Sequence, residues 1–183
     1  MNKKVSREKI SIIFNDFSSQ KKEKADFEIL KKFKKVFEEG SFKNVGTYIS
    51  TEKEVSSNLI NTYLLKKKCK LFAPKVQSES KTLKFTEYLN NEDLVENNYG
   101  ILEPKNDNTF PIEELDLVIV PLRAFSKDLK RLGFGSGYYD RTFENHKSTN
   151  LLGLAYSFQY LENLILEEFD IKLSSVITED ILF

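Results

Sequence analysis

The segment LDLVIVP, residues 115–121, is the feature that most constrains the fold of this chain. It is nearly all apolar, and it does not alternate with polar residues as a strand with one face in water would do. Continuous apolar strands of this kind are buried on both faces, which is typical of the central sheet of an α/β protein. We therefore expect this segment to be a central strand with a layer of structure on each side.

The rest of the chain alternates between helical and extended patterns. Helices are predicted at 3–17, 20–39, 54–67, 137–147 and 158–167, and strands at 44–50, 69–76, 82–89, 115–121, 150–156 and 173–178. Residues 99–111 are predicted to form a loop, because they contain turn formers and two of the four prolines. Alternating helices and strands favour a mostly parallel sheet. We expect one three-layer, Rossmann-like α/β domain over residues 1–183, with helices on both faces.

Charge and cysteine content limit the possible partners and compartment. Lysine plus arginine equals aspartate plus glutamate, at 28 each, so net charge gives no reason to expect nucleic acid or a membrane as a partner. Cys69 is the single cysteine and cannot form an internal disulfide, which suits a reducing compartment. The N-terminal segment has no continuous apolar stretch of the signal-peptide type. We expect a cytoplasmic protein that acts as a monomer.

The segment RLGFGSGYYDR, residues 131–141, is the strongest candidate for a functional site, and we call it the glycine segment. Three of the seven glycines of the chain fall within five residues of it. Glycine lets backbone N–H groups approach an anion closely, Arg131 and Arg141 can supply positive charge, and Asp140 can hold a magnesium ion. These features predict a polyphosphate site. The pattern is neither a Walker A sequence nor a dinucleotide fingerprint, so a structural loop is the alternative.

The whole string is more specific than its glycines, and it resembles the signature loop of the 5-formyltetrahydrofolate cyclo-ligase family. Further elements resemble that family in the same order, namely Lys3 with Arg7, Tyr48 to Val55, 71-LFAP-74, 100-GILEP-104, Val120-Pro121, Ala124-Phe125, 152-LGLA-155, and Asp170 with 178-TE-179. The chain departs from the family at Leu122 and Arg123, where small residues are usual, and at Ser126, where an acid often stands. A serine also replaces the aspartate that often precedes the final V-x-T-E.

The resemblance implies an activity. Members of the family close the ring of 5-formyltetrahydrofolate to 5,10-methenyltetrahydrofolate in a reaction that needs ATP and Mg²⁺ and releases ADP and phosphate. The formyl oxygen is phosphorylated by ATP, and nitrogen 10 then attacks the activated carbon. The protein mainly positions the two substrates and stabilises charge.

The resemblance also implies roles for individual residues. ATP-binding residues are expected to be Lys3, Arg7, Arg131, Leu132, Gly133, Phe134, Gly135, Ser136, Gly137, Tyr138 and Tyr139. Folate-binding residues are expected to be Ile49, Glu54, Phe134, Gly135, Ser136, Gly137 and Tyr138, together with Leu83. Asp140 and Asp170 are expected to hold Mg²⁺, and Arg131, Tyr138 and Asp140 to act in catalysis.

Structural alternatives stand beside these roles. Lys3 and Arg7 can be a solvated basic helix face, and Glu54 can be a first-turn residue of the helix predicted at 54–67. His146 lies in a polar loop and is expected at the surface, and Cys69 is expected to be a small buried apolar residue. For the whole chain, the alternatives are an inactive folate- and nucleotide-binding module, or a ligase or kinase that acts on another acyl or formyl compound.

Overall fold

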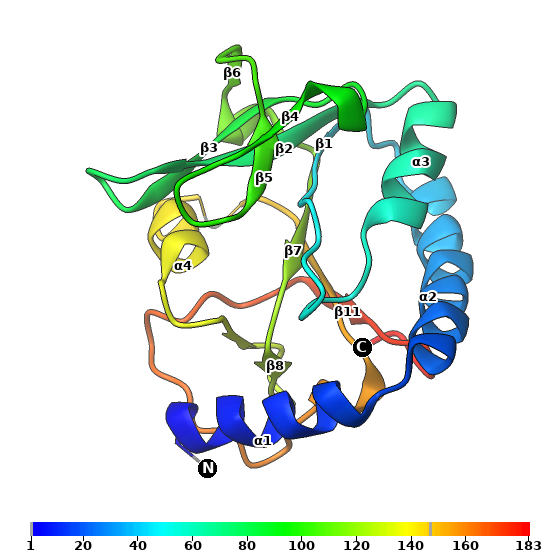
Figure 1. Ribbon diagram of the computed structural model, residues 1–183, viewed down its shortest axis with the longest axis vertical. Coiled ribbons are helices and arrows are strands. Elements are labelled where there is room, and N and C mark those ends of the chain that lie inside the picture. The colour runs from blue at the N-terminus through cyan, green and yellow to red at the C-terminus, as the bar shows by residue number, and fades with distance from the viewer. Residues whose placement is uncertain (1, 147) are drawn as a thin grey trace.

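A seven-stranded sheet forms the centre of the computed structural model, which describes residues 2–146 and 148–183 (Figure 1). The strand order is β11-β10-β7-β1-β2-β3-β6. The strands are β1 (Asn44–Gly46), β2 (Lys70–Gln77), β3 (Thr82–Glu87), β6 (Thr109–Phe110), β7 (Leu117–Pro121), β10 (Leu151–Leu154) and β11 (Ser175–Ile177). Neighbours from β11 to β2 are parallel, whereas β3 is antiparallel to both β2 and β6. The predicted mostly parallel sheet is confirmed.

Strand β7 lies inside this sheet, and its side chains alternate between two hydrophobic cores. Leu117 and Ile119 belong to one core, and Val118 and Val120 belong to the other. All four side chains are at most 1% exposed to solvent. The expectation that residues 115–121 contain a strand buried on both faces is therefore confirmed.

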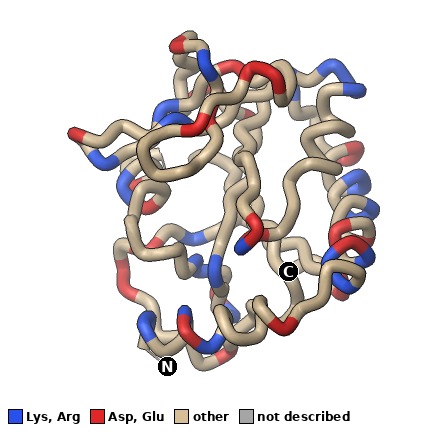
Figure 2. Tube along the Cα trace, viewed as in Figure 1, with Lys and Arg blue, Asp and Glu red and all other residues tan. Residues whose placement is uncertain are grey.

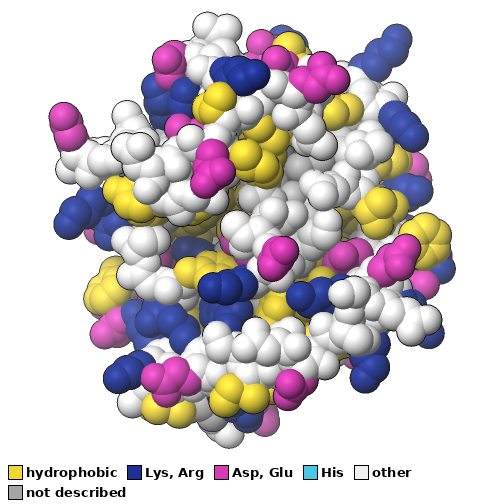
Figure 3. All heavy atoms as spheres, in the orientation of Figure 1, with side chains coloured by type: hydrophobic (Ala, Val, Ile, Leu, Met, Phe, Trp, Pro, Cys, Tyr) yellow, Lys and Arg dark blue, Asp and Glu magenta, His cyan; other side chains and the backbone are white. Residues whose placement is uncertain are grey.

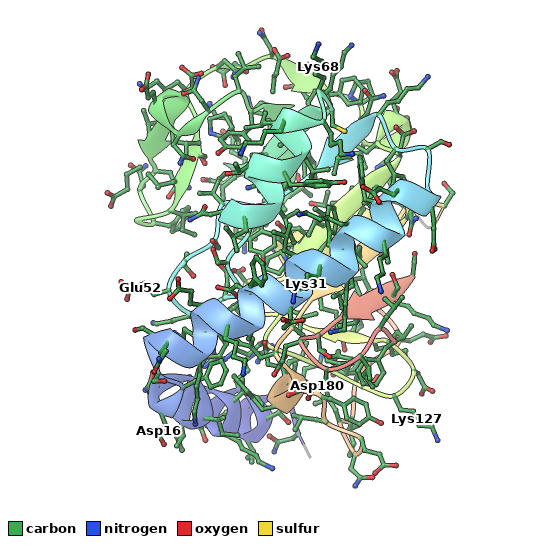
Figure 4. All side chains as sticks on the ribbon, turned by 90° about the vertical axis from the view of Figure 1, so that its right-hand side faces the viewer. Asp16, Lys31, Glu52, Lys68, Lys127 and Asp180 are labelled. Atoms are coloured by element: carbon green, nitrogen blue, oxygen red, sulfur yellow. The ribbon has the colours of Figure 1, made fainter. Side chains whose placement is uncertain are left out.

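Helices cover the two faces of the sheet unequally. The first core takes apolar side chains from α1 (Lys3–Asp16), α2 (Ser19–Glu39) and α3 (Asn58–Lys66). The short helix α4 (Tyr138–Phe143) packs on the other face, where its Phe143 belongs to the second core. Figure 1 shows α2 and α3 on the right of the sheet and α4 on the left. Figure 4 looks onto α2 and α3, with Lys31 on the outer side of α2.

Two smaller pairs of strands lie beside the main sheet. Strands β4 (Leu94–Glu96) and β5 (Leu102–Pro104) form an antiparallel hairpin, and β8 (Ala124–Phe125) pairs with β9 (Arg131–Leu132). The predicted loop at 99–111 is thus wrong in part, because it contains β5 and β6. Short 3₁₀ turns, η1 (Asn91–Asp93) and η2 (Ile112–Glu114), complete this region.

The predicted helix 158–167 is wrong. A single 3₁₀ turn, η3 (Ser157–Gln159), stands there, followed by turns and irregular chain. The buried Gln159 side chain explains the short element, because its Oε1 accepts from the Tyr156 backbone N–H at 2.7 Å and its Nε2 donates to the Leu122 carbonyl at 2.9 Å. A side chain that holds its own backbone in a tight turn competes with a continuing helix.

Three other predicted elements are shorter than expected. The strand predicted at 44–50 ends at Gly46, and the helix predicted at 54–67 begins at Asn58. Between them lies a loop whose two ends are joined by a hydrogen bond from the Ser57 hydroxyl to the Tyr48 carbonyl at 2.6 Å. The helix predicted at 137–147 spans Tyr138–Phe143, and Lys147 lies outside the described residues. The remaining predicted helices and strands agree with the structure within a few residues.

Charged side chains are mixed along the chain. Figure 2 shows Lys and Arg alternating with Asp and Glu along α2, without a stripe of one sign. Among the described residues, no helix is both long and apolar enough to cross a membrane.

Candidate active site around the glycine segment

The glycine segment runs from strand β9 through a turn into helix α4. Gly137 precedes the helix with φ +70°, a left-handed conformation that glycine adopts without strain. At Gly133, a Cβ atom would lie 2.9 Å from the guanidinium nitrogens of Arg131, so a larger residue there would displace the end of that side chain. The glycines therefore permit a tight turn around a buried arginine, which a plain surface loop would not require.

Arg131 is the buried centre of this turn, with a side chain only 3% exposed. Its Nη1 donates to the Pro121 carbonyl at 3.0 Å, and its Nη2 lies 3.5 Å from an oxygen of Asp140. The guanidinium also lies 5.1 Å from the centre of the Tyr139 ring. Within the described residues, its buried Nε has no hydrogen-bond partner. Arg131 thus links the end of β7 to the first turn of α4.

A cavity of about 490 Å³ opens on one side of the glycine segment, and we call it the charged cavity. Its walls come from α1, the glycine segment, α4 and the loop before β11. The lining residues are Lys3, Arg7, Gly133, Gly135, Ser136, Gly137, Asp140, Arg141, Glu144, Phe169 and Asp170. Three basic side chains and the backbone of the glycine turn face one space, which suits a polyphosphate.

The basic residues of α1 are tied to the walls of the charged cavity. Lys3 forms ion pairs with Asp170, at 2.8 Å, and with Glu167. Burial alone would lower the pKa of Lys3, but the hydrogen bonds to these two carboxylates raise it. The Nε of Arg7 donates to the Gly133 carbonyl at 2.8 Å. The basic face of α1 is therefore docked onto the site, and its interpretation as a solvated helix face is wrong.

Two carboxylates, Asp140 and Asp170, line the charged cavity together. Asp140 lies in the first turn of α4, and its Oδ1 accepts from the Ile171 backbone N–H at 3.4 Å. Asp170 precedes Ile171 in the chain and accepts from the Glu167 backbone N–H at 2.7 Å. The described residues contain no group of three or more His, Cys, Asp and Glu side chains that could hold a metal ion. A pair of carboxylates fits Mg²⁺, which usually takes one or two of them and completes its shell with water and phosphate oxygens.

A second cavity, of about 290 Å³, lies on the other side of the glycine segment, and we call it the apolar cavity. It is built from segments that are distant in sequence. One part comes from Tyr48, Ile49, Thr51, Lys53, Glu54 and Pro121, another from Pro74, Val76 and Leu83 of β2 and β3, and a third from Asn97, Ile101, Leu102 and Glu103 of the β4–β5 hairpin. The glycine segment closes it with Arg131, Phe134, Ser136, Gly137, Tyr138 and Tyr139. Figure 3 shows apolar side chains in a hollow on this face of the molecule.

Glu54 supplies an acidic group to the apolar cavity. Its Oε2 accepts from the Thr51 backbone N–H at 2.7 Å and from the Thr51 hydroxyl at 2.8 Å. Burial raises the pKa of Glu54, although the bonds to Thr51 and the charges of Arg131 and Arg123 oppose this effect. Because α3 begins only at Asn58, the interpretation of Glu54 as a first-turn helix residue is wrong. A half-buried carboxylate in an apolar wall suits a ligand with several N–H donors.

The structure divides the predicted site residues between the two cavities. Lys3, Arg7, Gly133, Gly135, Asp140 and Asp170 line the charged cavity, and Ile49, Glu54, Leu83, Arg131, Phe134, Tyr138 and Tyr139 line the apolar cavity. Ser136 and Gly137 line both. Leu132 is fully buried in the first core and lines neither. Leu132 therefore has a packing role. Gly135 lines only the charged cavity.

Sequence reasoning missed several lining residues. The β4–β5 hairpin was not expected to contribute to the site, yet it covers one side of the apolar cavity. Ile101 and Leu102 of this hairpin are exposed apolar residues in a segment with many polar ones. This pattern could have indicated that the hairpin faces a ligand. Tyr48, Lys53, Glu144 and Phe169 were also missed. His146 lies outside both cavities, and Cys69 is half-buried against the first core.

Comparison with known proteins supports the resemblance found in the sequence. The sequence model described as the 5-formyltetrahydrofolate cyclo-ligase family matches residues 1–179. The chain belongs to this family. Among curated cyclo-ligases, one from Haemophilus influenzae is 36% identical over 147 residues, which cover 78% of this chain and 79% of the relative. A cyclo-ligase from Escherichia coli K12 is 35% identical over 73% of this chain and 76% of its own length.

Solved structures of the cyclo-ligase family share this fold. A 5,10-methenyltetrahydrofolate synthetase from Mycoplasma pneumoniae superposes with a TM-score of 0.80 at 26% identity, over 98% of this chain and 99% of that one. The synthetase from Aquifex aeolicus superposes with a TM-score of 0.85 at 28% identity, over 98% of this chain and 91% of its own. The match therefore extends over nearly the whole chain, including the segments that line both cavities.

Proposed function

We propose that this chain catalyses the ATP- and Mg²⁺-dependent closure of 5-formyltetrahydrofolate to 5,10-methenyltetrahydrofolate, with release of ADP and phosphate. The observation that carries the proposal is the position of the glycine segment between the two cavities. Ser136 and Gly137 line both of them. A terminal phosphate in the charged cavity and a formyl group in the apolar cavity would meet at these residues.

The reaction needs this meeting point. The formyl oxygen attacks the γ-phosphorus of ATP, and the bond from that phosphorus to the bridging oxygen of ADP breaks. Nitrogen 10 then attacks the formyl carbon, loses its proton, and the former formyl oxygen leaves as part of inorganic phosphate. Phosphorylation turns a poor leaving group into a good one. The protein contributes orientation and charge stabilisation, which are the main catalytic effects in phosphoryl transfer.

The phosphates of ATP would be bound by α1 and the glycine segment. Lys3 and Arg7 lie one helical turn apart and line the charged cavity together. The backbone from Gly133 to Gly137 faces the same space, and Arg141 adds a further positive charge at its edge. The buried guanidinium of Arg131 stands behind the turn, where it would stabilise charge that develops on the transferred phosphoryl group.

Asp140 and Asp170 would hold Mg²⁺ between α4 and the loop before β11. When bound, the ion supplies positive charge that neutralises the β- and γ-phosphate oxygens. Lys3 now neutralises Asp170, and Arg131 lies close to Asp140. These contacts fix the positions of both carboxylates, and Mg²⁺ would replace Lys3 as the partner of Asp170.

The folate would occupy the apolar cavity. Glu54 would accept hydrogen bonds from the amino and ring N–H groups of the pterin, while Ile49, Leu83 and Phe134 would pack against its rings. A tyrosine phenol is protonated near neutral pH, so Tyr138, which lines this cavity, could donate a hydrogen bond to the formyl oxygen. Tyr139 packs beside the buried Arg131 and completes this wall.

Both proposed binding sites come from one chain. We therefore propose that residues 1–183 act as one domain and as a monomer in the cytoplasm, with neither nucleic acid nor membrane as partner. Sedimentation of the active protein at its assay concentration tests the monomer, and a dimer would contradict it.

The experiment is an absorbance assay of ring closure. Purified protein is mixed with 5-formyltetrahydrofolate, ATP and MgCl₂, and the near-ultraviolet band of the conjugated methenyl product is followed. We expect the band to grow only when ATP and Mg²⁺ are both present. Absence of the band, with retained folate or ATP binding in calorimetry, would replace the proposal by an inactive binding module.

A further inference from the structure

Arg123 is a buried arginine that the proposed reaction does not use. It follows strand β7, and only 4% of the residue is exposed. Its backbone N–H donates to the Leu132 carbonyl at 2.8 Å, and its own carbonyl accepts from Gln159 at 3.1 Å. Burial lowers the pKa of Arg123, and nearby Glu54 opposes that change. Burying a guanidinium is costly, so its contacts indicate what it does for the structure.

The side chain of Arg123 contacts three separate elements. On α1 it donates to the Ser11 hydroxyl, and its guanidinium lies 5.4 Å from the ring centre of Phe14. In the loop before α3 it donates to the Lys53 carbonyl at 3.5 Å. In the glycine segment it lies 5.6 Å from the ring centre of Phe134. Within the described residues it forms no ion pair within 4.0 Å.

Phe134 is a partly exposed aromatic residue that packs into neither hydrophobic core. The residue is 42% exposed to solvent. Its ring nevertheless lines the apolar cavity, as do Lys53 and Glu54 of the loop before α3. A guanidinium held by buried neighbours offers a fixed surface on which such a ring can rest.

Arg123 itself lines neither cavity. We propose that Arg123 is a positioning residue that holds Phe134 and the Lys53–Glu54 loop, two parts of the wall of the apolar cavity, in fixed relative positions. In this way it sets the affinity for the folate substrate. This inference rests on the proposed function, because it assigns the apolar cavity to folate. It gives a role to the large cation that stands directly after the central strand in this chain.

The first test is the replacement Arg123→Met, which keeps the length of the side chain and removes its charge and planar face. We expect the Kd for 5-formyltetrahydrofolate to rise about tenfold, which corresponds to a desolvated cation–π contact and the loss of support for Glu54. The Kd for MgATP should stay within about twofold. Lys127→Met, at an exposed position in the loop between β8 and β9, is the control and should change neither constant.

The second test separates positioning from general stability. Phe134→Leu is made alone and together with Arg123→Met, and folate binding is measured by calorimetry. If Arg123 acts through Phe134, the Kd of the double variant for folate should be about equal to the larger of the two single-variant Kd values. Additive losses would overturn the inference, and so would a parallel loss of folate and ATP affinity. If Arg123→Met does not fold, Arg123→Lys replaces it in the same cycle, since lysine keeps the charge and loses the planar face.

Binding by the wild-type chain distinguishes this inference from the proposed function. If the wild type binds MgATP but no 5-formyltetrahydrofolate, the proposed function is wrong and the inference falls with it. If the wild type binds folate and the Arg123 variants bind it equally well, only the inference is overturned.

Discussion

The two cavities on either side of the glycine segment differ in the partners that their charged and polar side chains contact. In the charged cavity, the groups proposed to bind MgATP already contact one another: Lys3 pairs with Asp170, Arg131 lies beside Asp140, and Arg7 binds the Gly133 carbonyl. Among the described residues that line the apolar cavity, no two form an ion pair, and Glu54 is held by its own loop. Binding of MgATP must therefore exchange existing contacts, whereas binding of folate mainly removes water from a wall already in place.

This difference separates the expected effects of mutation. A change in the charged cavity removes a ligand of the phosphate or metal and also leaves an internal partner unpaired. A change in the apolar cavity mainly alters one substrate contact. We therefore expect variants of the charged carboxylates to lose turnover, and variants of the apolar cavity to lose folate affinity.

The largest effect is expected for Asp140→Asn. The change keeps the shape of the side chain but removes a proposed Mg²⁺ ligand and the negative charge beside Arg131. We expect turnover at saturating substrates to fall about 10³-fold, the upper range for losing one key electrostatic group. The absorbance assay at high MgCl₂ measures it, with Asp180→Asn at an exposed position as the control. Wild-type turnover of Asp140→Asn would remove Asp140 from the metal site.

Glu54→Gln should produce a smaller and more selective loss. An amide can accept only part of the hydrogen bonds that the carboxylate offers to a pterin, and bonds to a charged group contribute about 1.5–3 kcal/mol. We expect folate to bind roughly 10- to 100-fold more weakly, with the KM for ATP unchanged. Glu52→Gln, two residues away and exposed at the surface, is the matched control (Figure 4). Equal folate affinity of Glu54→Gln and wild type would exclude Glu54 from the pterin site.

Lys3→Met tests the exchange of contacts in the charged cavity. In the structure without ligands, Lys3 neutralises Asp170. Removal of the Lys3 charge takes one cation from the phosphate site but also leaves the Asp170 carboxylate free to bind Mg²⁺. These effects oppose each other, and we expect only about a fivefold rise in the KM for ATP, consistent with a partly exposed ion pair. Lys4→Met, on the exposed neighbouring position, should leave the KM unchanged. A rise of a hundredfold or more would show that Lys3 binds phosphate without this compensation.

The smallest effect concerns Asp26, which lies outside both cavities and accepts a hydrogen bond from Tyr156 at 2.9 Å. Burial raises the pKa of Asp26 from 3.8 to about 6. Because the folded state holds this proton more tightly than the unfolded state, the stabilisation is complete below pH 4 and is lost as the pH rises through 6. Thermal unfolding from pH 4 to 7 should show this decline in wild type and a weaker one in Asp26→Asn, with kcat unchanged. If stability fell equally with pH in the two proteins, the raised pKa of Asp26 would be contradicted.

The sequence predicted the charged cavity better than the apolar cavity, and chain topology explains why. The glycine segment lies within one short stretch, so its chemistry is visible locally, and the family resemblance alone added Lys3 and Arg7. The apolar cavity joins the loop that carries Lys53 and Glu54, strands β2 and β3, and the β4–β5 hairpin, part of which falls within the loop predicted at 99–111. Those contacts depend on β3 running antiparallel to β2, which no local pattern indicated. The false helix at 158–167 has a similar origin, since the Gln159 side chain satisfies a distant carbonyl.

The central claim is that the formyl oxygen meets the γ-phosphorus of ATP at Ser136 and Gly137. The most direct measurement uses 5-formyltetrahydrofolate labelled with ¹⁸O in the formyl group, with MgATP and the wild-type chain. The inorganic phosphate is then examined by ³¹P NMR for the isotope shift of a P–¹⁸O bond. We predict one ¹⁸O atom in each phosphate released with the methenyl product. Unlabelled phosphate alongside full ring closure would show that the oxygen leaves by another route, and would contradict the account.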